Sequence, residues 1–421
     1  MSGKGAMMFG NIRGNARGCL LYEPMFVIPY SMFTTYSSLY MKELGLSDTQ
    51  IGFITSLGLL VQIYSSFISG YLTDVLGRRK ALILFDLLSW SIATLIWAVS
   101  QNFWYFFIAA IINGFQKVPN TAWNCLLVED TDPQDRPVIF AVLQFIGIIA
   151  GFFAPLGGLL VKRFTLVPAM RIMYAIAFVS MTLMFIGRNY ATHETDIGIK
   201  KMKESSGLKF SDSIKEYVSA VREIWNNKAL MIIFAVYILN NFQITIRGTY
   251  QYLYLVDVLK LSDVMISVFP SVSSLAMLIL LFFIMPRLKN EYADKYMKYG
   301  FAASLVANLI LVLAPPANIP LAMVSTLLVS AGGMIITPYL ESAVANAISD
   351  ETRAKTFSIL TVLILLFISP AGIIGGWTYS IQPRIPFVLV AVTFLLCIIL
   401  MGVLVKYNRV NCGEKKASSE L

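Results

Sequence analysis

Five ionisable residues stand inside long apolar stretches of this sequence, where a charge is costly and therefore informative. They are Glu23, Asp86, Lys117, Arg247 and Glu341. A charge at the centre of a bilayer costs about 2.5–3.5 kcal/mol on insertion scales, so such residues usually have a partner and a function. A carboxylate that binds and releases protons near neutral pH can couple proton movement to another event. We therefore expect proton coupling at Glu23, with Glu341 next and Asp86 as a further candidate.

Each of these residues also has a plainer interpretation. Counting 1.5 Å per residue along a helix places Glu23 and Lys117 at similar depth, so the two could form an ion pair that is either functional or structural. Asp86 fits a structural role as well. The guanidinium of Arg247 offers five fixed donors, which suits a carboxylate or a phosphate on a bound solute.

The segments that carry these residues are long enough to cross a bilayer. The chain has 421 residues, 57% of them hydrophobic and 14% charged, with a mean hydropathy of +0.70. This composition, with repeated apolar runs of about 20 residues, indicates a lipid environment and argues against nucleic-acid binding despite the net charge of +9. The expected spans are 17–41, 50–75, 81–99, 103–127, 137–161, 168–188, 229–256, 264–286, 296–314, 319–345, 355–379 and 385–406.

The spans predict an all-α membrane protein with twelve transmembrane helices in two six-helix bundles, because only helices satisfy the backbone of a lone segment in hydrocarbon. We expect the first bundle at 1–188 and the second at 229–406. Residues 189–228 form a linker whose part from Leu208 to Trp225 has the pattern of an amphipathic helix, either on the membrane surface or in solution. Residues 407–421 form a tail.

The positive charges predict the orientation. We count 25 of the 33 Lys and Arg residues on the side that holds both termini and the linker, and Arg188 is one of these 25. Positive residues remain in the cytoplasm, so both termini are expected inside, in a multi-pass protein of the plasma membrane. The single histidine, His193, fits a solvated loop residue, and the four scattered cysteines indicate neither a disulfide framework nor a zinc site.

The loop after the second span carries a glycine, three residues, an aspartate, two residues and then Gly-Arg-Arg. These are Gly70, Asp74, Gly77, Arg78 and Arg79. This pattern resembles the signature loop of the major facilitator superfamily, although Val75 stands where that family usually has a basic residue. The resemblance implies a twelve-helix transporter fold in which Asp74 belongs to a charge network that latches the two halves. It also implies a place in that network for three residues of the next loop on the same side: Glu129, Asp130 and Arg136.

A second, partial resemblance lies in the fifth span, where Pro155 precedes the pair Gly157–Gly158. The antiporter motif of the same family has Gly-Pro, two residues and Gly-Gly. Here Ala154 replaces the first glycine and one spacer residue is missing. Small residues that let helices approach closely explain the pattern better.

Polar side chains follow one helical face of the first, fourth, seventh and tenth spans, which line the central cavity in the family that the chain resembles. Polar groups that face lipid cost several kcal/mol, so these faces should contact protein or water. Hydrogen bonding between helices is the alternative explanation. We expect solute binding by Tyr30, Thr34, Asn113, Lys117, Asn120, Asn124, Asn240, Gln243, Arg247, Gln251 and Thr337.

These features predict a secondary transporter, not an enzyme. It would move a small polar, anionic or sugar-like solute by alternating access, in symport with protons, as a monomer in the lipid bilayer. No cofactor or metal is expected, since the sequence has neither a Walker loop nor a cluster of metal ligands. Proton-antiport efflux of amphipathic compounds and lipid flipping on the same fold remain alternatives.

Overall fold

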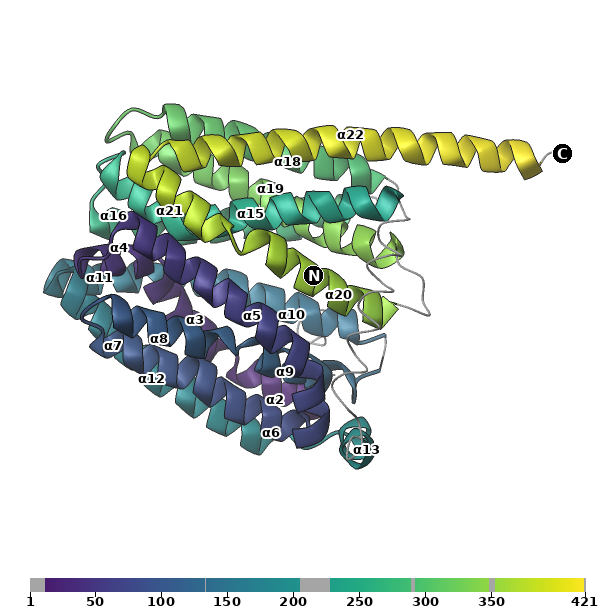
Figure 1. Ribbon diagram of the computed structural model, residues 1–421, viewed down its shortest axis with the longest axis horizontal. Coiled ribbons are helices and arrows are strands. Elements are labelled where there is room, and N and C mark those ends of the chain that lie inside the picture. The colour runs from purple at the N-terminus through teal and green to yellow at the C-terminus, as the bar shows by residue number, and fades with distance from the viewer. Residues whose placement is uncertain (1–11, 133, 205–227, 289–291, 348–352, 420–421) are drawn as a thin grey trace. The chain divides into compact units, whose positions relative to one another are not determined.

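The structure is a computed structural model that describes residues 12–132, 134–204, 228–288, 292–347 and 353–419 (Figure 1). The described residues are overwhelmingly helical and contain no strand. The chain divides into two compact units. The first is Met1–Phe210 with Asp263–Ser271, and the second is Ser211–Ser262 with Val272–Leu421.

The first unit contains the helices of the first six expected spans and the start of the eighth. They are α2 (Gly14–Tyr22), α3 (Pro24–Thr34), α4 (Ser37–Glu43), α5 (Asp48–Leu76), α6 (Arg78–Asp86), the π-helix η1 (Leu87–Ile92), α7 (Ala93–Val99), α8 (Phe103–Gly114), α9 (Lys117–Val128), α10 (Arg136–Ala150), the 3₁₀ turn η2 (Gly151–Phe153), α11 (Ala154–Phe164), α12 (Leu166–Ala191), α13 (Asp196–Glu204), α16 (Asp263–Ile266) and the beginning of α17 (Val268–Ile279).

The second unit contains the remaining helices. They are α15 (Lys228–Asp257), the rest of α17, the π-helix η4 (Leu280–Ile284), the 3₁₀ turn η5 (Met285–Arg287), α18 (Ala293–Leu313), α19 (Ile319–Ala347), α20 (Arg353–Ile368), α21 (Ala371–Ile381) and α22 (Ile385–Ser419). Within this unit, α18 packs along α19 and α22, and α15 packs along α20 and α22.

Ten stretches of helix among the described residues are long and apolar enough to cross a membrane. The other two expected spans are interrupted. The first span is divided into α2, α3 and α4, and the fourth into α8 and α9. The multi-pass helical fold is therefore confirmed, with its first and fourth spans built from short helical pieces.

Proline explains two of the three breaks in these spans; the third lies at Thr35–Tyr36, between α3 and α4. Pro24 and Pro119 each lack the N–H that would bond to the carbonyl four residues earlier, and each ring crowds that carbonyl. The helix accordingly breaks at Glu23, between α2 and α3, and at Phe115–Gln116, between α8 and α9. Each break lies one to four residues before its proline, as this steric conflict requires.

Serine hydroxyls satisfy carbonyls that other prolines leave free. Pro29 cannot bond to the carbonyl of Met25, which instead accepts a 2.7 Å hydrogen bond from Ser180. Pro155 likewise leaves the carbonyl of Gly151 to Ser271, at 3.0 Å. Such replacement bonds let proline persist in a membrane helix without an unsatisfied backbone group.

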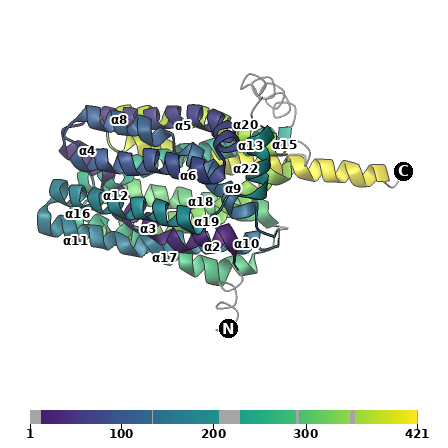
Figure 2. The same ribbon diagram turned by 90° about the horizontal axis from the view of Figure 1, so that it is seen from below.

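The glycine pair of the fifth span lies at a close helix contact. A Cβ at Gly157 would lie 3.0 Å from the carbonyl oxygen of Met32, and one at Gly158 would lie 3.1 Å from that of Val264. Both contacts belong to the first unit, where α11 and α16 lie side by side (Figures 1 and 2). Close packing therefore explains this part of the partial antiporter pattern.

Candidate functional site

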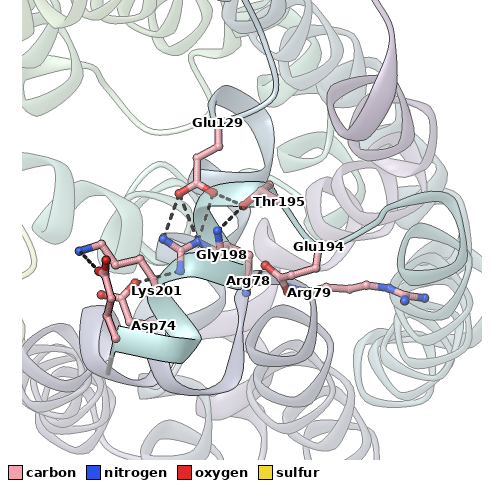
Figure 3. Close-up of polar contacts among 9 residues, drawn as sticks. Asp74, Arg78, Arg79, Glu129, Glu194, Thr195, Gly198 and Lys201 are labelled. Atoms are coloured by element: carbon pink, nitrogen blue, oxygen red, sulfur yellow. Dashed lines mark hydrogen bonds and ion pairs between the residues drawn. The ribbon is translucent and has the colours of Figure 1, made fainter. Parts of the chain in front are cut away.

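The signature loop forms a compact ionic network at one end of the first unit (Figure 3). The Arg78 guanidinium donates from Nη1 to Asp74 Oδ1 at 2.9 Å, and from Nε and Nη2 to the Glu129 carboxylate at 3.1–3.2 Å. Arg78 is only 4% exposed, so its charge depends on these two carboxylates. Within the first unit, Asp74 and Glu129 thus share one guanidinium.

Glu194 extends this network from a segment that the sequence interpretation had assigned to the linker. Its carboxylate accepts from the backbone N–H groups of Arg78 and Arg79, at 3.0 Å each. These are the first two residues of α6, whose N–H groups have no partner inside the helix. The negative charge also opposes the positive end of the helix dipole. Glu194 thus acts as a remote N-cap for the third span.

Gly77 makes room for this cap. Its φ is +82°, in the left-handed region that favours glycine, and a Cβ there would lie 2.7 Å from the Glu194 carboxylate and 2.8 Å from Met202 Sδ. The glycine of the signature loop therefore serves both the turn and the approach of residues 194–202. Gly70, by contrast, has open space around its Cα.

Thr195 joins the same network and starts α13. Its hydroxyl donates to Glu129 and accepts from the N–H of Gly198 at 2.9 Å. Thr195 is 1% exposed. A threonine directly before a helix is an ordinary N-cap signal that the sequence already contained. Glu194 carries no comparable local signal, because its partners lie more than a hundred residues away in the chain.

Two residues that were expected in this network lie elsewhere. Asp130 accepts from Asn15 Nδ2 at 2.6 Å, and His193 Nε2 lies 3.4 Å from the same oxygen. His193 is exposed, as expected for a loop residue, but its backbone also bonds to Asn15 at 2.8 Å. For Arg136, the described residues provide no ion pair, and its Nε is buried without a partner. Among the described residues, neither Asp130 nor Arg136 bonds to Asp74, Arg78 or Glu129, and their place in the network stays a prediction.

A cavity of about 190 Å³ lies inside the first unit, at the level of both helix breaks. Its walls combine charged, amide and aromatic side chains with a few apolar ones. They are Glu23, Phe26, Leu82, Asp86, Trp90, Gln116, Pro119, Asn120, Trp123, Met184, Phe185 and Arg188. Because interrupted membrane helices expose polar groups at mid-membrane, such breaks commonly accompany binding sites in transporters.

Asp86 and Arg188 form a buried ion pair on this cavity, between Oδ2 and Nη2. Their side chains are 8% and 5% exposed. The sequence interpretation had counted Arg188 among the cytoplasmic topology charges. That was wrong, because α12 continues to Ala191 and Arg188 points into the bundle. The Arg188 guanidinium also lies 5.4 Å from the centre of the Phe185 ring.

Glu23 lies on the same cavity, at the break between α2 and α3. Its carboxylate forms no hydrogen bond or ion pair with the residues that the structure describes. In particular, no ion pair joins it to Lys117 in the described part of the chain. The depth count assumed unbroken helices, whereas both spans are interrupted at these positions.

Other polar residues predicted for solute binding in the first unit have local partners. Asn113 donates to the carbonyl of Ser89 at 2.8 Å and accepts from Gln116 at 3.0 Å. Asn124 donates to Asn120, and Thr34 donates to the carbonyl of Tyr30. Of this group only Asn120 lines the cavity, while Tyr30 is exposed.

In the second unit, the predicted residues of α15 remain poorly satisfied. Gln243 Nε2 donates to Asn240 Oδ1 at 3.2 Å, but the buried Gln243 Oε1 accepts no hydrogen bond from a described residue. Arg247 Nη2 donates to Gln251 at 2.7 Å. No carboxylate lies within 4.0 Å of its guanidinium in the part of the chain that the structure describes.

On α19 the two predicted residues are exposed. The Thr337 hydroxyl donates to the carbonyl of Gly333 at 3.0 Å, and the Glu341 carboxylate forms no hydrogen bond or ion pair with a described residue. The described residues contain no group of three His, Cys, Asp or Glu side chains that could hold a metal ion. The predicted helix from Leu208 to Trp225 lies outside the described residues.

Comparison with known proteins decides the family. The model of the Major Facilitator Superfamily matches residues 25–294, well over half of the chain. The chain belongs to the major facilitator superfamily. The match covers the signature loop, the interrupted fourth span and α15, and it begins in α3, just after the break at Glu23.

Relatives are distant. An uncharacterized MFS-type transporter of Bacillus subtilis (strain 168), YqjV, is 29% identical over 132 residues, which are 31% of this chain and 32% of the relative. The alignment thus spans about a third of that protein's length.

Solved structures share the fold at low identity. The peptide transporter POT in complex with sulfate matches with a TM-score of 0.68 and 15% identity, covering 94% of both chains. The nucleoside transporter NupG has a TM-score of 0.67 and 14% identity, covering 94% of this chain and 99% of its own. The human organic anion transporter MFSD10 has a TM-score of 0.60 and 15% identity, covering 92% and 100%. These likenesses establish the fold, whereas the solutes of those proteins differ from one another.

Proposed function

We propose that this superfamily member is a secondary transporter that moves a small polar solute together with protons by alternating access. The observation that carries the proposal is Glu23, a carboxylate without a described partner on a polar cavity at the break of the first span. A carboxylate held in this way can take up a proton without first losing an ion pair. The neighbouring Asp86, in contrast, already has Arg188 as its counter-ion.

Arg247 supports the proposal that the solute carries an anionic group. A guanidinium in a membrane-spanning helix needs a counter-charge, and its one described partner is the neutral amide of Gln251. A carboxylate or phosphate would accept two parallel hydrogen bonds from it. Gln243, one helical turn away, adds a buried amide oxygen that needs a donor.

Transport in proteoliposomes tests the proposal. The purified protein would be supplied with a panel of labelled carboxylates, phosphate esters and sugars, each with and without an inward proton gradient. We expect one anionic solute to accumulate only with the gradient. Glu23→Gln should abolish accumulation but retain exchange of labelled for unlabelled solute, because exchange needs no net proton movement. Accumulation by Glu23→Gln at the wild-type level would show that the coupling residue lies elsewhere, and Glu341→Gln would be tested next.

Proton-antiport efflux of amphipathic compounds is the second candidate, and the cavity walls favour it. Phe26, Trp90 and Trp123 present aromatic surface beside Glu23. In the same liposomes an antiporter would drive a hydrophobic solute against the proton gradient, whereas a symporter would drive a polar solute along with it. The direction of solute movement relative to the protons therefore separates the two candidates.

We place the protein in the plasma membrane with both termini and α13 in the cytoplasm. The excess of positive residues on that side supports this orientation. A cysteine introduced at the exposed Lys200, in a variant without the natural cysteines, should react with a membrane-impermeant maleimide only after the cells are opened. Labelling in intact cells would show that the protein has the opposite orientation.

A further inference from the structure

Three charged side chains from three helical elements line the cavity of the first unit. Glu23 comes from the break before α3, Asp86 from the end of α6 and Arg188 from α12. They are the only charged residues among those that line the cavity. Two acids and one base leave one negative charge when all three are ionised.

The Asp86–Arg188 pair is firmly held. Both side chains are buried, Phe185 lies beneath the guanidinium, and Phe26 packs edge-on to Trp90 with ring centres 4.9 Å apart. Two carboxylates thus lie on one cavity with a single guanidinium. Removing a charge from such a group leaves the remaining charges without compensation.

We propose that Arg188 is a positioning residue for proton coupling, acting as the internal counter-charge that favours the ionised form of Glu23, and that Asp86 limits this effect by holding Arg188. This inference rests on the proposed role of Glu23. A nearby positive charge favours the ionised form of a carboxylate, and a nearby negative charge favours its protonated form. The pair would therefore set the pH at which Glu23 gains and loses its proton.

No other charged group of the described residues lines the cavity. Lys117 begins α9 but does not contribute to the lining, and α9 contributes Pro119, Asn120 and Trp123. The helix α2, which packs on α12, carries three further titratable side chains: Arg17, which is exposed, Cys19 and Tyr22. Free thiols and phenols are neutral near pH 7 at their reference values, so Glu23 remains the group whose charge is expected to change.

Variants that remove either the positive charge of Arg188 or the negative charge of Asp86 provide the test. The pH dependence of labelled-solute uptake would be measured in proteoliposomes for single and double variants. The midpoint is the pH at which uptake is half-maximal. Arg188→Gln removes the positive charge, so this midpoint should move to higher pH, by about one unit for a charge at close range. Asp86→Asn releases Arg188 toward Glu23, so the midpoint should move to lower pH. The double variant removes a neutral pair and should have a midpoint between those of the single variants.

A purely structural pair predicts a different result. In that case both single variants would lose activity and thermal stability without opposite midpoint shifts, and the proposal would be overturned. Should Arg188→Gln fail to fold, Arg188→Lys keeps the charge and should leave the midpoint unchanged, while Asp86→Asn and the double variant still carry the test. Shifts of both single variants in one direction would also reject the proposal.

The background variant Glu23→Gln separates this inference from the function on which it rests. In that background, neither Asp86→Asn nor Arg188→Gln should move a pH midpoint. Retention of proton-driven accumulation by Glu23→Gln itself would reject Glu23 as the coupling residue. Normal coupling through Glu23, combined with unshifted midpoints in the pair variants, would reject only the role of Arg188.

Discussion

The signature-loop network of the first unit and the polar face of α15 in the second unit differ in how far their charged and polar groups have partners. Arg78 contacts two carboxylates, and Glu194 satisfies two free backbone donors. Arg247 has one neutral partner among the described residues, and Gln243 Oε1 has none. A satisfied network stabilises one arrangement of the chain, whereas an unsatisfied polar group in an apolar setting is a cost that a ligand can remove.

The largest effect is expected at Arg78. Arg78→Gln leaves Asp74 and Glu129 without their shared cation, and loss of one partner from a buried ion pair costs roughly 3–5 kcal/mol. Asp74 is partly exposed, so we expect the lower end of that range. Thermal unfolding in detergent measures the loss, and Lys80→Gln, at an exposed neighbour, is the matched control. Equal melting temperatures for the two variants would contradict a structural role for the network.

A second variant in the Arg78 network, Asp74→Asn, tests whether the network affects transport separately from folding. Asp74 supplies one of the two carboxylates on Arg78, and Glu129 remains. Protein level should stay near normal while the rate of solute uptake falls several-fold, because the change alters the balance between transport states more than the fold. Full uptake at a normal protein level would show that Asp74 has no role in the transport cycle.

An intermediate effect is expected at Arg247. Arg247→Lys keeps the charge but loses the planar pair of donors, so binding of an anionic solute should weaken about tenfold with the melting temperature unchanged. Asn241→Ala is the control, since Asn241 lies on α15 and its side chain donates to the carbonyl of Tyr237 in the same helix. Isothermal titration with the transported solute measures both. A large loss of stability instead of affinity would mean that Arg247 is structural, like Arg78.

The smallest effect is expected at Glu194. Glu194→Gln retains an oxygen acceptor for the α6 N–H groups but loses the charge that opposes the helix dipole, a difference of about 0.3–1 kcal/mol. Glu204→Gln, a half-exposed acid at the end of α13, is the control. Hydrogen–deuterium exchange of α13 should rise in Glu194→Gln alone. Equal exchange in both variants would show that α13 is held without Glu194.

The helical membrane fold followed from the sequence because apolar length and charge bias depend on local composition. That Asp74 and Glu129 lie in one network, here through their shared partner Arg78, agrees with the family pattern. Arg188 was misplaced because a charge near the end of an apolar run resembles a topology charge until its distant partner Asp86 is known. Glu194 was missed for the same reason, since capping by a residue from another segment leaves no local pattern.

The binding-site prediction depended on straight helices. Equal spacing along a helical face grouped Asn113 with Asn120 and Asn124, but the break at Phe115–Gln116 separates them, and Asn113 instead bonds to the carbonyl of Ser89. Pro24 and Pro119 were visible in the sequence and could have predicted both breaks. Which side chains then meet at a break depends on the packing of four helices, and a single sequence does not contain that information.

The π-helix that follows Asp86 has an evolutionary consequence. Residues Leu87–Ile92 accommodate one residue more per turn than an α-helix, with Asn113 bonded to the carbonyl of Ser89 within it. A π-turn is therefore what a single inserted codon leaves behind in a helix that cannot shift its ends. Relatives with a continuous α-helix here should align with a one-residue gap between positions 87 and 92. Deleting one residue there should restore a continuous α-helix from α6 to α7 and leave the carboxylate of Asp86 facing Arg188.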